Sequence, residues 1–297
     1  MAATVCLMNI VKTVKDQIFE SVKLYIQTNV SKRAAPGDWR AREAALTAFG
    51  CLVEGPDRSK LLPFAQEAFG FLLQQGLGDE HAMVRRTTLW TLGRIFEFLH
   101  VATPSGQQPL VTAQNIGNIV DALLGAMQSG PGMAQKACYA VQALAEGFSS
   151  DEDSHALTSH FANIIEALFK VAYAEVAEQA ATLHVTAFEA MHTVIQQSAQ
   201  QSIQLVTQMI PHLLQKIGET FAGIDNSQLP EEAQRAIAQR RVELQGQLCT
   251  ALQVRHALYI SHVCNLTELR TGLSPFAVAP HHTCAHCSCC SCATRSP

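Results

Sequence analysis

Residues 83–99 read MVRRTTLWTLGRIFEFL, and residues 38–55 read DWRAREAALTAFGCLVEG. Both stretches carry basic residues first, a glycine in the middle and a Glu near the end, with apolar residues at three- and four-residue spacing. When they are overlaid, the superimposed pairs are Arg42 and Arg85, Gly50 and Gly93, and Glu54 and Glu97, each 43 residues apart. This agreement predicts that one helical unit is repeated along the chain.

Two further stretches extend the repeat. QKACYAVQALAEGF at residues 135–148 places Glu146 opposite Glu97 at a separation of 49 residues. VTAFEAMHTVIQQSA at residues 185–199 keeps the apolar spacing but lacks the Glu at that position. Repeats of about 40–50 residues with two helices each are typical of α-solenoids of the HEAT or armadillo kind. We therefore predict an all-α fold of stacked helical hairpins.

Turn-forming residues divide the chain into segments of helix length. The turns that carry Asp38 and Arg42, or Asp79 and Arg85, favour the HEAT type, because an acid there can cap the second helix while the Arg inside that helix pairs with a neighbouring acid. The predicted helical pairs are 14–30/38–55, 59–76/80–99, 113–128/132–148, 155–172/175–199 and 202–221/231–255. Residues 1–12 then form the unpaired second helix of a preceding repeat, without the polar face of an end repeat, so we expect a longer array.

Composition favours a helical scaffold and disfavours several other functions. Of 297 residues, 48% are hydrophobic and only 6% aromatic, which suits a large helical core. A formal net charge of −4 leaves no basic surface for nucleic acid, and no apolar run reaches the roughly 18 residues of a membrane span. The sequence contains no G-x-S-x-G, H-E-x-x-H or P-loop pattern, so we expect a binding protein without a cofactor rather than an enzyme.

The overlay also places Trp90 and Tyr139 at one repeat position, opposite Thr47. Each aromatic residue precedes the repeated Glu by seven residues, so the ring and the carboxylate share one helical face, two turns apart. Stacked second helices would align these residues along an inner groove, where carboxylates bind Lys and Arg while rings contact their stems and guanidinium groups. The predicted site for a basic segment consists of Glu54, Trp90, Glu97, Tyr139 and Glu146. The alternatives are core aromatic residues and ordinary surface Glu residues of the last helical turn.

Three stretches resemble the middle of the importin-β (karyopherin-β) family of nuclear import receptors. They are DWRAREAALTAFGCLVEGP from residue 38, VRRTTLWTLGRIFE from residue 84 and CYAVQALAEG from residue 138, and the resemblance covers about residues 2–255. It implies a HEAT-repeat superhelix of the cytoplasm, nucleus and nuclear pore that wraps the basic segment of importin-α, is released by the GTPase Ran and binds Phe-Gly nucleoporins. It also implies that Trp90 contacts the basic segment and that Tyr139 replaces a second Trp, which weakens the cation–π contact. From the resemblance we expect the family repeats that carry much of the Ran contact to lie outside this sequence.

The resemblance ends after Val254, so the solenoid is predicted to span residues 1–255 and a disordered tail residues 256–297. The tail is rich in Pro, His and Cys, with five cysteines at Cys284, Cys287, Cys289, Cys290 and Cys292. Thiolates bind zinc or copper, but the distant second pair of a zinc finger is absent, so we predict no metal site and keep a metal-binding tail as an alternative. Translated intron or out-of-frame sequence would also explain the tail. A truncated product without function, or a different HEAT scaffold such as a phosphatase regulatory subunit, would also explain the chain.

Overall fold

The computed structural model describes residues 2–100, 109–148, 154–174 and 181–209, together with isolated positions between 211 and 246. Its longer helices are α1 (Ala2–Val14), α2 (Phe19–Asn29), α3 (Trp39–Leu52), α4 (Arg58–Phe71), α5 (Ala82–Leu99), α6 (Ile116–Met127), α7 (Pro131–Glu146), α8 (Phe161–Ala172) and α9 (Ala181–Gln196). The part of the chain that the structure describes consists of helices and turns without a strand, which confirms the all-α prediction. No helix in these residues is long and apolar enough to cross a lipid bilayer.

Helices α2 to α9 form four successive hairpins, and α1 precedes them without a hairpin partner. The hairpins agree with the first four predicted pairs and differ from them only at the helix ends. The predicted fifth pair, 202–221/231–255, lies mostly outside the described residues. All described residues belong to the first of two units, Met1–His256, and the second unit, Ala257–Pro297, lies outside them. The predicted boundary after residue 255 therefore stays a prediction.

Local backbone geometry explains several of the turns. Lys15 has a φ of 53° immediately after α1 and turns the chain through a short 3-10 segment into α2. Gly130 has a φ of 103°, which a side chain would disfavour, and Pro131 then begins α7, where its missing N–H and fixed φ are tolerated. The helix cap expected from Asp38 is absent, because its carboxylate accepts the backbone N–H of Ala35 at 2.8 Å rather than an N–H of α3.

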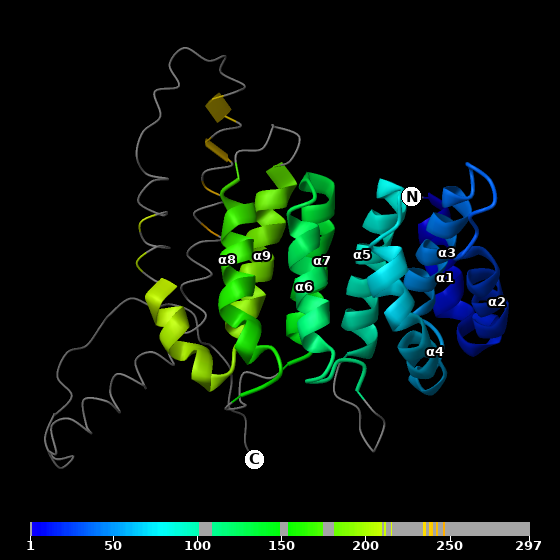
Figure 1. Ribbon diagram of the computed structural model, residues 1–297, viewed down its shortest axis with the longest axis horizontal. Coiled ribbons are helices and arrows are strands. Elements are labelled where there is room, and N and C mark those ends of the chain that lie inside the picture. Colours follow the sequence, from blue (N-terminus) through cyan, green and yellow to red (C-terminus); the bar gives the residue numbers. More distant parts are fainter. Residues whose placement is uncertain are drawn as a thin grey trace, which may run out of the picture. The chain divides into compact units, whose positions relative to one another are not determined.

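The second helices of the hairpins stack on one another in chain order. Helix α1 packs on α3, α3 on α5, α5 on α7 and α7 on α9, while each first helix packs on its own second helix. Figure 1 shows this order as the colour advances from the blue of α1 to α3 through the cyan of α5 to the green of α7 and α9. Residues roughly 40 to 50 positions apart are thereby neighbours on adjacent second helices, as a solenoid requires.

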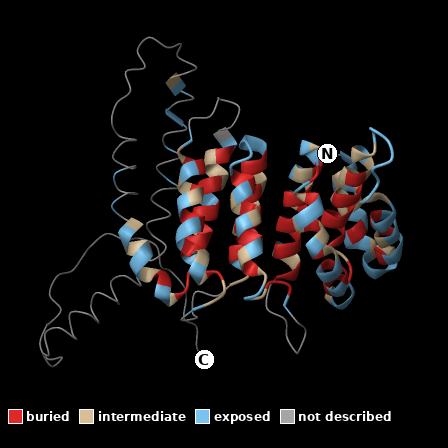
Figure 2. Cartoon of the chain, viewed as in Figure 1, coloured by how far each residue is buried: buried red, intermediate tan, exposed pale blue. Residues whose placement is uncertain are grey.

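One continuous core runs through the described hairpins. Small residues let the second helices approach closely: Ala134, Ala137 and Ala140 follow one another at three-residue spacing along α7, and all are buried. Larger side chains of the first helices, such as Leu123 of α6 and Phe161 of α8, belong to the same cluster. Figure 2 shows the buried residues facing neighbouring helices and the exposed ones facing outward, the pattern expected of amphipathic helices.

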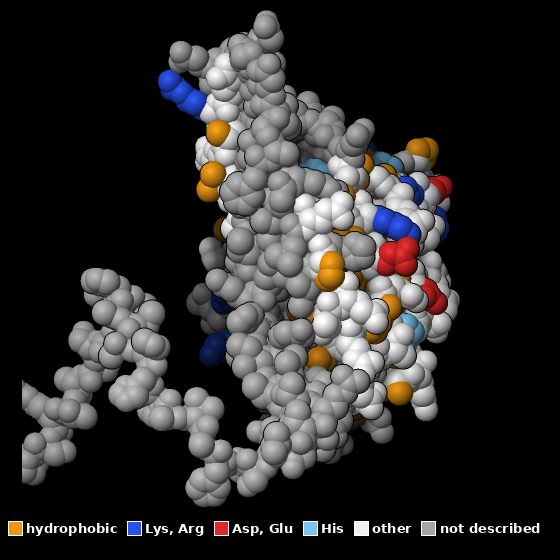
Figure 3. Space-filling model, turned by 90° about the vertical axis from the view of Figure 1, so that its left-hand side faces the viewer, with side chains coloured by type: hydrophobic (Ala, Val, Ile, Leu, Met, Phe, Trp, Pro, Cys, Tyr) orange, Lys and Arg blue, Asp and Glu red, His pale blue; other side chains and the backbone are white. Residues whose placement is uncertain are grey.

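Large hydrophobic side chains that remain exposed are dispersed over the described residues. They are Val5, Ile10, Leu24, Tyr25, Met83, Leu205 and Val242. On the face in Figure 3, wherever it is not grey, orange hydrophobic atoms are likewise scattered among polar and charged side chains.

A buried ion pair connects the hairpin α2–α3 to the hairpin α4–α5. Arg42 of α3 is 2% exposed and donates from Nε and Nη2 to the carboxylate of Asp79, at 2.8 and 2.9 Å. Asp79 also accepts from the Arg33 guanidinium at 3.0 Å and from the backbone N–H of His81 at 2.9 Å. Burial alone would raise the pKa of Asp79, but these hydrogen bonds outweigh it and lower that pKa. Arg42 thus pairs with a neighbouring acid, as the turn pattern predicts, whereas Arg85 donates to the backbone oxygens of Asp79 and Glu80 at 2.6 and 3.0 Å.

Candidate functional site

The two repeated aromatic residues each lie across the preceding second helix. The Trp90 ring of α5 covers Gly50 of α3, and the Tyr139 ring of α7 covers Gly93 of α5. A Cβ atom at either glycine would collide with the ring above it. Both aromatic residues are half-buried, so part of each ring stays on the surface. The repeated glycine therefore has a packing role: it makes room for the ring of the next helix.

A chain of hydrogen bonds runs across four second helices beside these rings. Arg94 of α5 donates from Nη2 to Oε2 of Glu54, two residues after the end of α3, at 2.5 Å and from Nη1 to Glu97 Oε2 at 3.1 Å. Lys12 of α1 pairs with the other oxygen of Glu54 at 2.5 Å. Tyr139 of α7 donates from Oη to Glu97 Oε2 at 2.6 Å. We call these five residues the acid–base chain, and it joins two of the predicted site acids to one of the predicted site rings.

The acid–base chain shifts the ionisation of two of its members. Burial would raise the pKa of Glu54, but hydrogen bonds from Lys12 and Arg94 outweigh it and lower the pKa below its ordinary value. Burial also raises the pKa of the Tyr139 hydroxyl, and its hydrogen bond to the Glu97 carboxylate raises it further. Glu54 is therefore ionised and already compensated by two cations, while Tyr139 stays a neutral donor.

Arg94 holds the centre of the acid–base chain in place. The residue is 8% exposed, its Nε donates to the backbone oxygen of Gly50 at 3.3 Å, and its guanidinium lies 4.4 Å from the centre of the Phe98 ring. The two acids differ in accessibility, because the side chain of Glu54 is 17% exposed and that of Glu97 is 37% exposed. Of these two carboxylates, Glu97 is the one that a partner can reach.

Glu146, the third predicted acid, lies on α7 and is exposed. Its carboxylate accepts a hydrogen bond from Gln142 at 3.2 Å and takes no part in the acid–base chain. The structure thus brings Glu54, Glu97 and Tyr139 into one network and places Trp90 against the Gly50 that Arg94 also contacts. Glu146 lies on α7, the next second helix after α5.

Sequence reading missed Lys12 and Arg94, for different reasons. Arg94 precedes Glu97 by three residues, a spacing that indicates a helical ion pair, so the pattern contained a usable signal. Lys12 gave no such signal, because its contact with Glu54 exists only where α1 stacks on α3.

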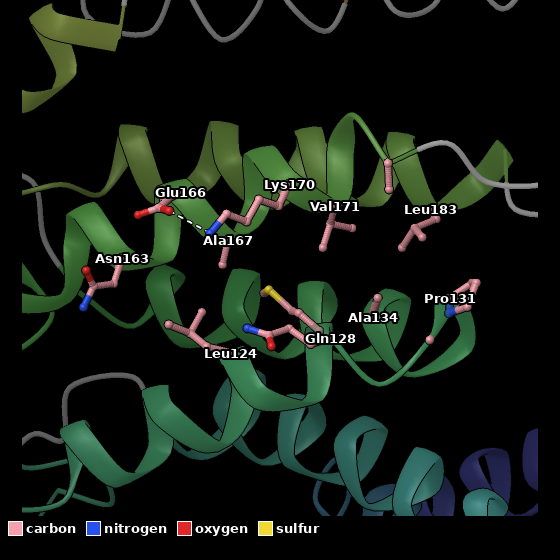
Figure 4. A pocket seen from close by; sticks show the side chains of 13 residues that line it. Leu124, Gln128, Pro131, Ala134, Asn163, Glu166, Ala167, Lys170, Val171 and Leu183 are labelled. Carbon is pink, nitrogen blue, oxygen red and sulfur yellow. Dashed lines mark ion pairs between the residues drawn. The ribbon is translucent and has the colours of Figure 1, made fainter.

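A separate cavity of about 510 Å³ lies between the first helices α6 and α8 and reaches the start of α7 and α9. Leu124, Val171 and Leu183 contribute apolar surface to it. Figure 4 shows the side chains of α8 facing those of α6 and α7 across the cavity, with the Glu166–Lys170 ion pair at 2.7 Å along the α8 wall. Its size and apolar lining residues suit a bulky apolar side chain, and polar residues such as Gln128 and Asn163 also line it.

The five tail cysteines considered for metal binding lie outside the described residues. Within the residues that the structure does describe, no group of three or more His, Cys, Asp or Glu side chains is arranged to hold a metal ion.

Comparison with known proteins assigns the chain to a family. A family described as importin subunit beta-1-like TPR repeats matches residues 118–261, and a HEAT-like repeat family matches residues 39–95. Importin subunit beta-1 of Arabidopsis thaliana is 37% identical over 254 residues, which are 86% of this chain and 28% of that protein. This chain belongs to the importin-β family. The family resemblance predicted from the sequence is confirmed, and the chain spans about a quarter of the curated relatives' length.

Solved structures of Kap95 share this fold. Kap95p with RanGDP gives a TM-score of 0.73 at 23% identity and covers 92% of this chain and 30% of that chain. The Kap95–Nup1 complex gives a TM-score of 0.73 at 21% identity, covering 92% of this chain and 29% of that chain. At such identities the likeness shows the fold alone, and it confirms the stacked HEAT-type solenoid of this importin-β family member.

Proposed function

We propose that this chain is part of a nuclear transport receptor whose second helices hold a basic segment of importin-α or of a cargo protein. One observation carries the proposal: the half-buried rings of Trp90 and Tyr139 pack on the preceding second helices, and the Tyr139 hydroxyl donates to the accessible carboxylate of Glu97. Membership of the importin-β family supports it.

The geometry suits Lys and Arg side chains. Their aliphatic stems lie on the exposed part of a ring, their charged heads face the ring or reach Glu97, and each Arg–carboxylate contact is a charge-assisted hydrogen bond. Because the two rings already pack against Gly50 and Gly93, they lose little conformational freedom when a partner binds. Glu54 has a different role in this proposal: it holds Arg94, while Glu97 and Glu146 contact the partner.

Binding of the basic importin-β-binding segment of importin-α tests the proposal. We expect Trp90→Ala to weaken binding of a fluorescent peptide by roughly 5- to 30-fold, since a buried aromatic anchor contributes strongly at an interface. Glu97→Gln should weaken it severalfold and reduce its dependence on salt concentration. Fluorescence anisotropy with the full chain measures both.

The matched control is the other tryptophan. Trp39 begins α3 and stacks on the His81 ring at a centroid distance of 3.8 Å. Trp39→Ala therefore removes a tryptophan without altering the contact between Trp90 and Gly50. The peptide should bind this control as it binds the unaltered chain. Equal affinity of all three variants would remove the proposed site.

The same proposal includes a second contact, with the Phe-Gly repeats of nucleoporins, in the cavity between α6 and α8. A solved structure of this fold is a complex with Nup1, and the cavity of about 510 Å³ is large enough for a Phe ring between apolar walls. Release by Ran and passage between cytoplasm and nucleus through the pore belong to the proposal as properties of the longer receptor, since this chain spans 28% of its Arabidopsis relative.

Filling the cavity tests the nucleoporin contact. Ala167 lines the cavity, so Ala167→Phe should occupy the space and weaken binding of a Phe-Gly peptide by about tenfold, measured by NMR titration of the peptide. Ala162→Phe, at an exposed position of the same helix α8, is the control and should leave binding unchanged. Unchanged Phe-Gly binding in the Ala167 variant would place that contact elsewhere.

A further inference from the structure

The row of second helices carries two cations near the end opposite to Glu97. Arg86 lies one helical turn before Trp90 on α5, and its side chain extends over the first turn of α7, 3.9 Å from where a Cβ of Gly132 would lie. Lys136 of α7 is half-buried, and burial, together with the nearby charge of Arg86, lowers its pKa. Within the described residues neither cation forms an ion pair.

The acid at the equivalent position of α3 is engaged elsewhere. Glu43 corresponds to Arg86, 43 residues earlier, and it accepts hydrogen bonds from Thr87 at 3.0 Å and Thr47 at 3.3 Å. The positive end of the α7 helix dipole lies under the Arg86 side chain and adds to the local positive potential. Burial has removed part of the water around the Lys136 ammonium, and the charge of Arg86 disfavours its protonated form. An anion that binds between the two cations therefore stabilises both charges.

The residues along one face of α5 define a direction for a bound segment. Arg86, Trp90, Gly93 and Glu97 follow at spacings of four, three and four residues, which places them on one face of the helix. Arg86 and Glu97 are therefore about 16 Å apart along the helix axis. Helix α7 repeats the order of cation, ring and acid with Lys136, Tyr139 and Glu146. Along this face, one end carries Arg86 and Lys136, the middle carries the rings, and the other end carries the exposed carboxylates of Glu97 and Glu146 beside the buried Arg94.

We propose that this groove selects a dipolar segment, in which an Asp or Glu of the partner binds between Arg86 and Lys136 while its basic residues contact the rings and Glu97. This inference rests on the proposed function and deepens it, because it fixes the direction of the bound segment and adds an acidic position to its sequence. An all-basic segment leaves the two cations unpaired and places its own charge against them.

A glutamate scan tests the proposal. Peptides carry one Arg/Lys cluster and a single Glu placed at increasing distances on either side of it, with Ala in its place as reference, and anisotropy with the full chain measures affinity. We expect one window of positions, on one side only, where Glu strengthens binding by roughly threefold to tenfold, as charge-assisted hydrogen bonds do. In the double variant Arg86→Gln/Lys136→Gln this gain should disappear while the all-basic peptide binds more tightly.

The control variant is Lys32→Gln/Lys60→Gln, which changes the net charge equally, just after the first helix α2 and on the first helix α4, and should keep the gain. A Glu that weakens binding at every position, or a gain that survives in the Arg86/Lys136 variant, overturns the dipolar groove. The proposed function is judged separately, by the affinity of the all-basic peptide and its loss in Trp90→Ala. Absence of all-basic binding overturns the proposed function and this inference with it.

Discussion

At the scale of single residues, two glycines without side chains determine how the second helices pack. Gly50 and Gly93 are buried under the rings of Trp90 and Tyr139, so each glycine and the ring of the next helix form one packing unit. The ring fills the space that a Cβ would take, and it carries hydrophobic contact from one hairpin to the next. The same rings form the proposed partner surface, so stacking and recognition depend on one set of residues.

This packing predicts opposite effects of the same substitution at two glycines. Gly50→Ala should destabilise the chain by about 1–3 kcal/mol, because the new methyl group forces the Trp90 ring from its place. Gly70→Ala, in helix α4 where no atom lies within 4 Å of the added Cβ, should stabilise by about 0.5–1 kcal/mol through helix propensity. Urea denaturation followed by circular dichroism measures both changes in unfolding free energy. Equal effects at the two glycines would contradict the packing of the Trp90 ring on Gly50.

At the scale of helices, the ends of α5 and α7 meet around His100. Its ring is 7% exposed, packs against the rings of Phe96 and Phe148 at centroid distances of 6.4 and 4.8 Å, and covers Gly147. Neither ring nitrogen has a hydrogen-bond partner among the described residues. Burial and, to a lesser degree, the charge of Arg58 lower the pKa of His100 to about 4. The junction of two hairpins thus contains a histidine that must stay neutral.

We expect this junction to weaken on acidification. The unfolded chain protonates His100 near its ordinary pKa of 6.5, while the folded chain keeps it neutral down to a pKa of about 4. The unfolded state therefore binds the proton first, and unfolding free energy falls by about 3 kcal/mol as pH drops from above 6.5 to about 4. Denaturation curves of the chain and of His100→Phe across this window measure the difference, since other titrating groups are common to both. Equal slopes with pH would show that His100 does not carry this effect.

At the scale of the whole chain, the proposed partner surface belongs to the stack rather than to any hairpin. The hairpins α2–α3, α4–α5 and α6–α7 all supply residues of this surface, and the acid–base chain and the Arg42–Asp79 pair fix neighbouring hairpins to each other. A solenoid of this kind binds by adding small contacts along its length.

The sequence by itself determined the helices, their pairing, the period of 43 to 49 residues and the family, because apolar spacing and self-similarity are written along the chain. It also put each ring and Glu on one helical face. Only the tertiary structure decided which residues meet across helices, since that depends on how far one helix is displaced along the next. By repeat position Trp90 corresponds to Thr47, yet its ring lies on Gly50, one turn further on. The stacking of α1 on α3 likewise brings Lys12 to Glu54, a contact that no repeat period specifies.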